Sequence, residues 1–395
     1  MEVCKIKIEQ IAWKTERDFE ILNHSHGFMD AHLVMIFGCR KLISQNELID
    51  SIQTRYPKAY LIGCTTAGEI LGTQVFDDTL TTTAINFETT VIENASVHVK
   101  KIGESYGAGL YLAEKLKRSD LKHVFVISEG LGINASELVR SLKENLPKNV
   151  AITGGVAGDG TLFEKTMVIA NGHASENLVT AIGFYGEHIK IGYGSVGGWD
   201  SFGPERIITK SKANILYELD GKSALELYKL YLGDYAKGLP ATGLLFPLSI
   251  RAKDSDEGLV RSMLKFNETG DGMFFAGDVP EGHYGKLMKA NFGSLVNGAL
   301  EAAELSIKSI EASPKIAILV SCIGRKVVLR QRIEEEVEVV RDVLGEECIL
   351  TGFYSYGEIS PYTEISCING KTSYKLETGC ELHNQTMTIT TIAEV

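Results

Sequence analysis

Two octets of one pattern lie near opposite ends of this 395-residue chain. The first spans residues 63–70 and reads GCTTAGEI, and the second spans 352–359 and reads GFYSYGEI. They align without a gap, with glycine first, a hydroxyl residue fourth and Gly-Glu-Ile last. Each follows a short apolar run that is typical of a buried strand. A chain with both octets is therefore expected to repeat one strand-and-turn unit.

The segments before the octets extend the repeat. An apolar run at 33–37 leads into Gly-Cys-Arg-Lys and a helical pattern over 44–55, and a run at 316–320 leads into Cys-Ile-Gly-Arg-Lys and another helical pattern. The strand, helix, strand and glycine-rich turn over 124–160 echo the same order. The predicted fold is α/β (mixed α+β), with two related halves of mixed sheets, helices packed on them, and an internal duplication.

The length of the chain indicates two domains, because a single core rarely serves 395 residues. We place the first domain at 30–220 and the second at 221–375. Residues 1–29 are then a lead-in, and 376–395 form a terminal strand.

Composition excludes several classes of partner. A net charge of −11 argues against nucleic acid and against anionic membrane surfaces. Seven scattered cysteines without a C-x-x-C pair favour a reducing, cytoplasmic location over a disulfide framework or a zinc knuckle. No signal region and no apolar run of about 18 residues is present, so we expect no membrane insertion.

The usual catalytic motifs are missing. The G-x-G-x-x-G at 192–197 precedes a second glycine-rich turn, whereas a dinucleotide site needs a helix there. No P-loop, nucleophile elbow or H-E-x-x-H helix occurs, and the histidines show no paired metal spacing, so a metal site remains unknown. We expect no enzyme, although the hydroxyls of Ser355 or Thr65 leave a hydrolase of unknown substrate as an alternative.

The octets are the predicted ligand site. Gly68 and Gly357 are expected to take positive φ, which would expose nearby N–H groups at the end of a strand. An arginine beside a glutamate suits a zwitterion such as an amino acid, and Arg40 with Glu69 and Arg325 with Glu358 are the two sets. Alternatively, each arginine–glutamate set could serve only to hold its own turn in place.

Further side chains complete the predicted site. Hydroxyl groups come from five residues of the octets: Thr65, Thr66, Tyr354, Ser355 and Tyr356. Trp199 is either a stacking wall for the ligand or an anchor between domains. The glutamates at 334–338 are expected to form a solvated helix face.

At these residues the chain resembles the FIST family. The octet at 63–70, the turn at 154–159 and Gly198-Trp199 with Gly203 look like its N-terminal part, and Phe246-Pro247-Leu248, 321–325 and 352–361 look like its C-terminal part. Asp200-Ser201 stands where a proline is expected.

The resemblance implies a cytoplasmic sensory protein that binds a small ligand, such as an amino acid, and regulates a signalling partner. It adds Asp159 to the predicted ligand contacts. Some stand-alone members are haem-binding nitric-oxide sensors that regulate histidine kinases. The resemblance thus makes haem a cofactor to consider, with His173, His188 and His283 as the histidines nearest glycine turns.

Overall fold

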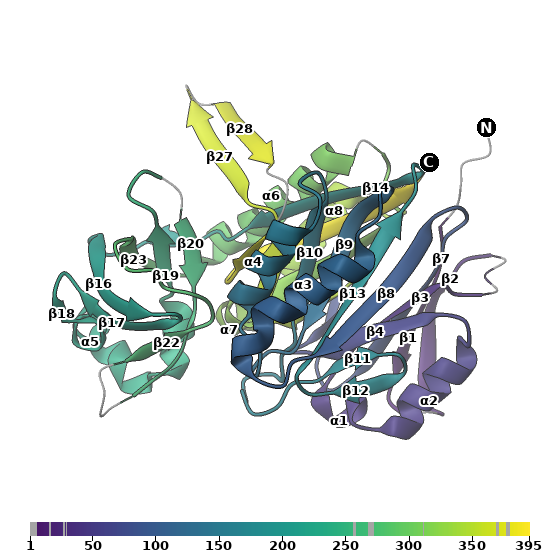
Figure 1. Cartoon of the computed structure of the whole chain (residues 1–395), viewed down its shortest axis with the longest axis horizontal. Coiled ribbons are helices and arrows are strands. Elements are labelled where there is room, and N and C mark those ends of the chain that lie inside the picture. Colours follow the sequence, from purple (N-terminus) through teal and green to yellow (C-terminus); the bar gives the residue numbers. More distant parts are fainter. Residues whose placement is uncertain are drawn as a thin grey trace.

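The computed structural model describes residues 6–15, 17–26, 28, 30–255, 258–267, 272–310, 312–368, 371–376 and 380–395. A main body of three sheets is joined to a smaller domain, which lies at the left of Figure 1. Helices pack on mixed sheets, which confirms the predicted mixed α/β class. In the described ranges, no helix is long and apolar enough to cross a membrane.

The main body contains three related units, each built around a parallel pair of strands joined by helices. In the first unit the pair is β3 and β4. Its elements are β1 (Lys7–Trp13), β2 (Phe19–His24), β3 (Leu33–Gly38), α1 (Arg40–Ile43), α2 (Asn46–Arg55), β4 (Tyr60–Thr65), β5 (Glu69–Leu71), β6 (Gln74–Phe76) and β7 (Leu80–Asn86). In the second unit the pair is β9 and β10. Its elements are β8 (Val91–His98), η1 (Ile102–Glu104), α3 (Ser105–Leu116), β9 (Leu121–Ser128), α4 (Ala135–Asn145), β10 (Ala151–Val156), β11 (Val168–Ala170), β12 (His173–Ser175) and β13 (Leu178–Tyr185).

The third unit is interrupted by the smaller domain and carries an extra hairpin. Its pair is β24 and β25. Its elements are β14 (Ile189–Val196), α6 (Phe292–Ile310), β24 (Ile316–Cys322), α7 (Ile323–Leu329), η4 (Arg330–Arg332), α8 (Glu335–Leu344), β25 (Ile349–Ser355), β26 (Gly357–Ser360), β29 (Glu381–His383) and β30 (Met387–Glu394), with β27 (Thr363–Ile368) and β28 (Lys371–Leu376) as the hairpin. The duplicated octets therefore belong to the first and third of three units, and the echo at 124–160 is the second.

Apart from the additional edge strand β2, the three sheets share one strand order, and a short strand of one unit completes the sheet of another. The orders are β12-β11-β4-β3-β7-β1-β2, β29-β26-β10-β9-β13-β8 and β6-β5-β25-β24-β30-β14. Thus β5 pairs with β25, β11 with β4 and β26 with β10, which closes a cycle through all three units. The turn that precedes each of these strands must lie where the sheets meet.

The centre of the body is an apolar core to which all three sheets contribute. Strands β3, β10 and β24 are buried along their whole length, as expected for parallel strands covered on both faces. The rings of Phe37 and Phe353 stack at 4.6 Å and join the first unit to the third. This core fixes the relative positions of the turns.

One glycine in each unit permits close contact between the two parallel strands. A Cβ on Gly63, Gly154 or Gly352 would lie 1.8, 1.8 or 1.9 Å from a carbonyl oxygen of the adjacent strand. The three positions are equivalent in register, since they pair with Ile36, Val126 and Leu319 respectively. The first residue of each octet is therefore glycine because the neighbouring backbone occupies the place of a side chain.

The smaller domain is one antiparallel sheet with a helix on it. Its elements are β15 (Asp200–Ser201), β16 (Arg206–Lys212), β17 (Ile215–Leu219), β18 (Lys222–Ser223), α5 (Ala224–Leu232), η2 (Gly233–Gly238), η3 (Ala241–Leu245), β19 (Leu248–Arg251), β20 (Gly258–Arg261), β21 (Met263–Phe266), β22 (Met273–Phe275) and β23 (Tyr284–Lys289). The predicted division at 220 falls in the turn between β17 and β18, which pair with each other.

Candidate functional site

The turns of the three units meet in a closed ring of backbone hydrogen bonds. The N–H of Ala67 donates to Tyr354 O at 2.8 Å, and the N–H of Tyr356 donates to Val156 O at 3.1 Å. The N–H of Gly158 donates to Thr65 O at 2.9 Å and completes the ring. The two octets and the turn at 154–160 are thus brought together, although they are far apart in the sequence.

Glu69 lies at the end of the first octet and is held by two hydroxyl groups. Thr66 Oγ1 donates to Glu69 Oε1 and Thr79 Oγ1 donates to Oε2, both at 2.6 Å. The residue is 1% exposed. Burial raises the pKa of Glu69 to about 7, against the opposing effect of the two hydroxyl donors. A carboxyl group with this pKa changes its charge near neutral pH.

Glu358 is the counterpart of Glu69 in the third unit. Ser355 Oγ donates to Glu358 Oε1 at 2.6 Å, and the N–H and hydroxyl of Thr386 donate to Oε2 at 3.1 and 3.0 Å. Burial raises the pKa of Glu358 to about 7 as well, and the Ser355 and Thr386 donors oppose it. Thr66 corresponds to Ser355 and Thr79 to Thr386, so equivalent hydroxyl groups hold the glutamate in both units.

The first of these two glutamates, Glu69, lines a cavity of appreciable size. A cavity of about 360 Å³ opens beside the first octet, and its wall contains Cys39, Arg40, Lys41, Thr66, Ala67, Gly68, Glu69, Asp77, Asp78, Asp159, Gly160, Thr161 and Leu162. Five predicted site residues belong to this wall: Arg40, Thr66, Gly68, Glu69 and Asp159. We call it the Glu69 cavity.

Gly68 shapes the floor of the Glu69 cavity. It has φ of +138°, as predicted, and a Cβ there would lie 2.3 Å from Lys326 Nζ. Lys326 instead donates to Ala67 O at 2.8 Å and pairs with Asp77. The prediction of positive φ at Gly357 is wrong, because this residue begins β26 and pairs with Val156 in extended conformation.

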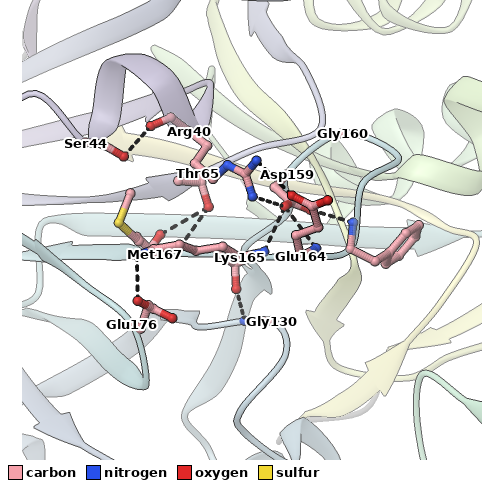
Figure 2. Close-up of polar contacts among 12 residues, drawn as sticks. Arg40, Ser44, Thr65, Gly130, Asp159, Gly160, Glu164, Lys165, Met167 and Glu176 are labelled. Carbon is pink, nitrogen blue, oxygen red and sulfur yellow. Dashed lines mark hydrogen bonds and ion pairs between the residues drawn. The ribbon is translucent and has the colours of Figure 1, made fainter.

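Asp159 fixes the loop at 160–165, part of which lines the cavity. Figure 2 shows the contacts of Asp159. Its carboxylate accepts from the N–H groups of Phe163, Glu164 and Lys165 at 2.9 to 3.1 Å and from Arg40 Nη1 at 3.1 Å. The hydroxyl of Tyr356 donates to it as well. With five donors and a side chain that is 1% exposed, Asp159 positions Arg40 and the loop.

Arg40 is one of two accessible cations of the cavity wall, the other being the exposed Lys41. The side chain of Arg40 is 29% exposed, and its contacts to Asp159 and Glu164 use two of the five N–H groups of a guanidinium. It does not pair with Glu69. The Arg40 and Glu69 side chains therefore present opposite charges to one cavity without neutralising each other directly.

The remaining predicted site residues are not part of the wall of the Glu69 cavity. Arg325 is completely buried and pairs with Glu336 at 2.8 Å, not with Glu358. Tyr354 OH donates to Glu336 at 2.6 Å. Thr65 Oγ1 accepts from Met167 N at 3.0 Å.

Glu336 was missed by the sequence pattern, which predicts a solvated face for its helix. That prediction is wrong for Glu336, which is 0% exposed and receives hydrogen bonds from Arg325, Ser321 and Tyr354. Its role is structural. Its partners lie 11 to 18 residues away, and local charge patterning carries no signal of them.

Trp199 belongs to the junction between the main body and the smaller domain. Its indole Nε1 donates to Gln385 O at 2.8 Å, and its ring packs against the cluster of Leu295, Val328 and Leu329. The sequence allowed Trp199 to be either a stacking wall for the ligand or an anchor between domains. Its contacts are those of an anchor at the junction.

The surroundings of the three histidines considered above do not favour a haem. His173 and His188 are exposed, and His283 lines a cavity of about 720 Å³. That wall carries many charged side chains, among them Arg140, Arg251, Arg261, Asp278 and Glu381, whereas a porphyrin needs largely apolar walls. Within the described ranges, no three His, Cys, Asp or Glu side chains gather as they would around a metal ion.

Comparison with known proteins identifies the class. Residues 32–222 match the FIST N domain and residues 224–361 match the FIST C domain. These are sensory domains, and the chain belongs to the FIST family.

Individual relatives are distant. An uncharacterized protein of Methanocaldococcus jannaschii, MJ1623, is 23% identical over 355 residues, which cover 79% of this chain and 66% of that protein, just under two thirds of its length. A crystal structure of chorismatase is 8% identical with a TM-score of 0.35, covering 100% of this chain and 99% of that one. A cyanuric acid hydrolase from A. caulinodans is 10% identical with a TM-score of 0.20, covering 78% and 99%.

Proposed function

We propose that this FIST protein senses a small zwitterionic molecule, such as an amino acid, in the Glu69 cavity and regulates a signalling partner, for example a histidine kinase. The observation that carries the proposal is one cavity lined by both the Arg40 guanidinium and the Glu69 carboxyl group. The guanidinium would bind the ligand carboxylate in a forked contact, and Glu69 would accept from its ammonium group.

The size of the cavity agrees with a small ligand. Its volume of about 360 Å³ is near the lower end of the ~300–1,000 Å³ that small-molecule sites occupy. Asp77 and Asp78 add negative charge to the wall and favour a ligand with a cationic group. Thr66 and Thr161 add hydroxyl groups that can fix its orientation.

The raised pKa of Glu69 gives the site a pH dependence. An ammonium group binds the ionised carboxylate, and Glu69 ionises as the pH rises through about 7. Ligand affinity should therefore increase between pH 6 and pH 8. Binding the ammonium in turn lowers the pKa of Glu69, so protons should be released when the ligand binds near neutral pH.

Isothermal titration with the twenty standard amino acids tests the proposal. For an amino acid that binds, Glu69→Gln and Arg40→Gln should each weaken binding by at least about tenfold, the loss of one charge-assisted hydrogen bond. Glu358→Gln is the matched control, because it makes the same change in the counterpart of Glu69, outside the Glu69 cavity, and should leave affinity unchanged. The proposal is refuted if no amino acid binds, or if Glu69→Gln binds as tightly as the unmodified protein.

A further inference from the structure

A second and larger cavity lies between the main body and the smaller domain. Its volume is about 720 Å³, twice that of the Glu69 cavity. One wall comes from α4 and β29 of the body, and the other from β19, β20 and residues 278–283. We call it the interdomain cleft.

Arg261 is a buried cation in the wall of this cleft. It is 6% exposed, and its guanidinium donates to the carbonyl oxygens of Leu382 at 2.9 Å and of Val260 and Asp278 at 3.2 Å. It forms no ion pair with any carboxylate that the structure describes. Burial lowers the pKa of Arg261 to about 10, although Asp278 and Glu381 oppose this effect. A buried charge without a direct counter-ion is costly.

The other arginine and lysine residues of the cleft differ from Arg261 in this respect. Each pairs with a carboxylate: Arg140 with Glu137, Lys143 with Glu381 and Arg251 with Glu205. The backbone also makes room for the Arg261 guanidinium, since a Cβ on Gly277 would lie 2.7 Å from its Nε. The wall therefore holds one cation in a fixed place and leaves it without an anion.

Asp278 supplies an unsatisfied acceptor in the same wall. Its Oδ1 is buried and has no hydrogen-bond partner among the described residues. Its backbone N–H donates to Ser136 Oγ of α4, so the residue is attached to both walls of the cleft. Buried polar atoms normally have a partner, and those that lack one call for an explanation.

We propose that the interdomain cleft is a second ligand site, which takes a small molecule with both an anionic group and a hydrogen-bond donor, as an α-amino acid has. Arg261 binds the anionic group and Asp278 Oδ1 accepts from the donor. The ligand thereby supplies the anion that Arg261 lacks and the hydrogen-bond donor that Asp278 Oδ1 lacks.

The position of the cleft gives such a ligand a way to act. The smaller domain is joined to the body by two chain segments, one after β14 and one before α6 (Figure 1). A ligand that touches both walls stabilises one relative arrangement of the two parts in proportion to its differential affinity. This site is independent of the Glu69 cavity, which contains no residue of the smaller domain.

Calorimetry of the full chain with the twenty standard amino acids tests the second site. Arg261→Lys keeps the charge but loses the forked guanidinium, and Leu259→Trp fills the cleft from its wall without removing a hydrogen-bonding group. Both should weaken binding of the amino acid that occupies the cleft by at least tenfold. Glu69→Gln should leave that binding unchanged, and thermal melting shows whether each variant is folded.

The outcomes separate the two proposals. Binding that is lost in the two cleft variants and retained in Glu69→Gln supports the second site. Binding that is lost only in Glu69→Gln overturns the second site and supports the Glu69 cavity. The second site is also overturned if no amino acid binds, or if Leu259→Trp folds and binds every amino acid as the unmodified protein does.

Discussion

Replacing Arg325 by methionine should be among the most destabilising single changes in the main body. Arg325 and Glu336 are both 0% exposed and are joined by contacts of 2.9 and 2.8 Å. The same guanidinium donates to Leu295 O at 2.7 Å and to Gly197 O. Methionine fills the space of the side-chain stem but leaves the Glu336 charge unpaired and two carbonyl groups without their donor.

The expected loss follows from these contacts. Removing one partner of a buried pair costs about 3–5 kcal/mol, because the remaining charge stays buried. Ser321 and Tyr354 still donate to Glu336, which argues for the lower half of that range. We therefore expect the free energy of unfolding to fall by about 3–4 kcal/mol.

Urea denaturation at pH 7, followed by circular dichroism, measures the change. Arg332→Met is the matched control, because Arg332 pairs with Glu335 at the surface and an exposed pair contributes only ~0–1 kcal/mol. In the double variant Arg325→Met/Glu336→Gln the buried charge is gone, so more than about 1 kcal/mol should be recovered. A loss below about 1 kcal/mol for Arg325→Met, equal to that of the control, would refute the reasoning.

Three further changes test the fold, the junction and the buried carboxyl groups. Gly154→Ala should prevent stable folding, since its Cβ would lie 1.8 Å from a carbonyl oxygen, whereas Gly107→Ala in α3 meets no atom within 4 Å and should stabilise by ~0.5–1 kcal/mol in thermal melting. Trp199→Ala should speed limited proteolysis between the body and the smaller domain without shifting the urea midpoint of the body; equal cleavage rates would contradict an anchoring role. Glu358 has a folded pKa of about 7 against an ordinary value of 4.5, so the folded state binds the proton more tightly. Its stabilising contribution is complete below about pH 4.5 and is lost as the pH rises through 7, at ~1.4 kcal/mol per pKa unit and about 3 kcal/mol in all. Glu358→Gln should therefore lose less stability than the unmodified protein between pH 5 and pH 8 in urea titrations, and parallel curves would contradict the assignment.

Much of the framework could be predicted from the sequence, because it rests on local patterns. Apolar runs such as 33–37 and 316–320 are strands that are buried along their length. The spacing of Thr66 and Glu69 within one turn already allows the hydrogen bond that the structure contains. The octets also meet, since equivalent turns follow equivalent strands.

The rest depends on contacts between distant segments. The second unit lacks the Gly-Glu ending, and its loop is held by Asp159 instead, so an alignment of octets finds two units and not three. The partners of Arg325 could not be assigned from sequence, because Glu336 looks like part of a solvated acidic run. The interdomain cleft requires the placement of the smaller domain against α4, for which no local pattern exists.

The first and third units carry equivalent glutamates whose surroundings differ. In the third unit, Thr386 closes around Glu358, and the side chain of Gln385 lies within 2.2 Å of where a Cβ of Gly324 would be. In the first unit the corresponding space is the Glu69 cavity. Because the units interlock, residues of the second unit also line that cavity.

A chain of direct contacts leads from this cavity toward the smaller domain. Asp159 of the second unit forms part of the cavity wall, and Lys326 of the third unit donates to Ala67 O behind it. Lys326 lies on α7, whose neighbouring residue Arg325 donates to Gly197 O, just before the smaller domain begins, and α7 also packs against η3. A ligand that moves Lys326 would therefore act on the helix that contacts both the body and the smaller domain. Such an effect requires the ligand to have unequal affinity for two arrangements of α7. Arg325 is therefore the residue at which to test it, since it lies on α7 but does not line the Glu69 cavity.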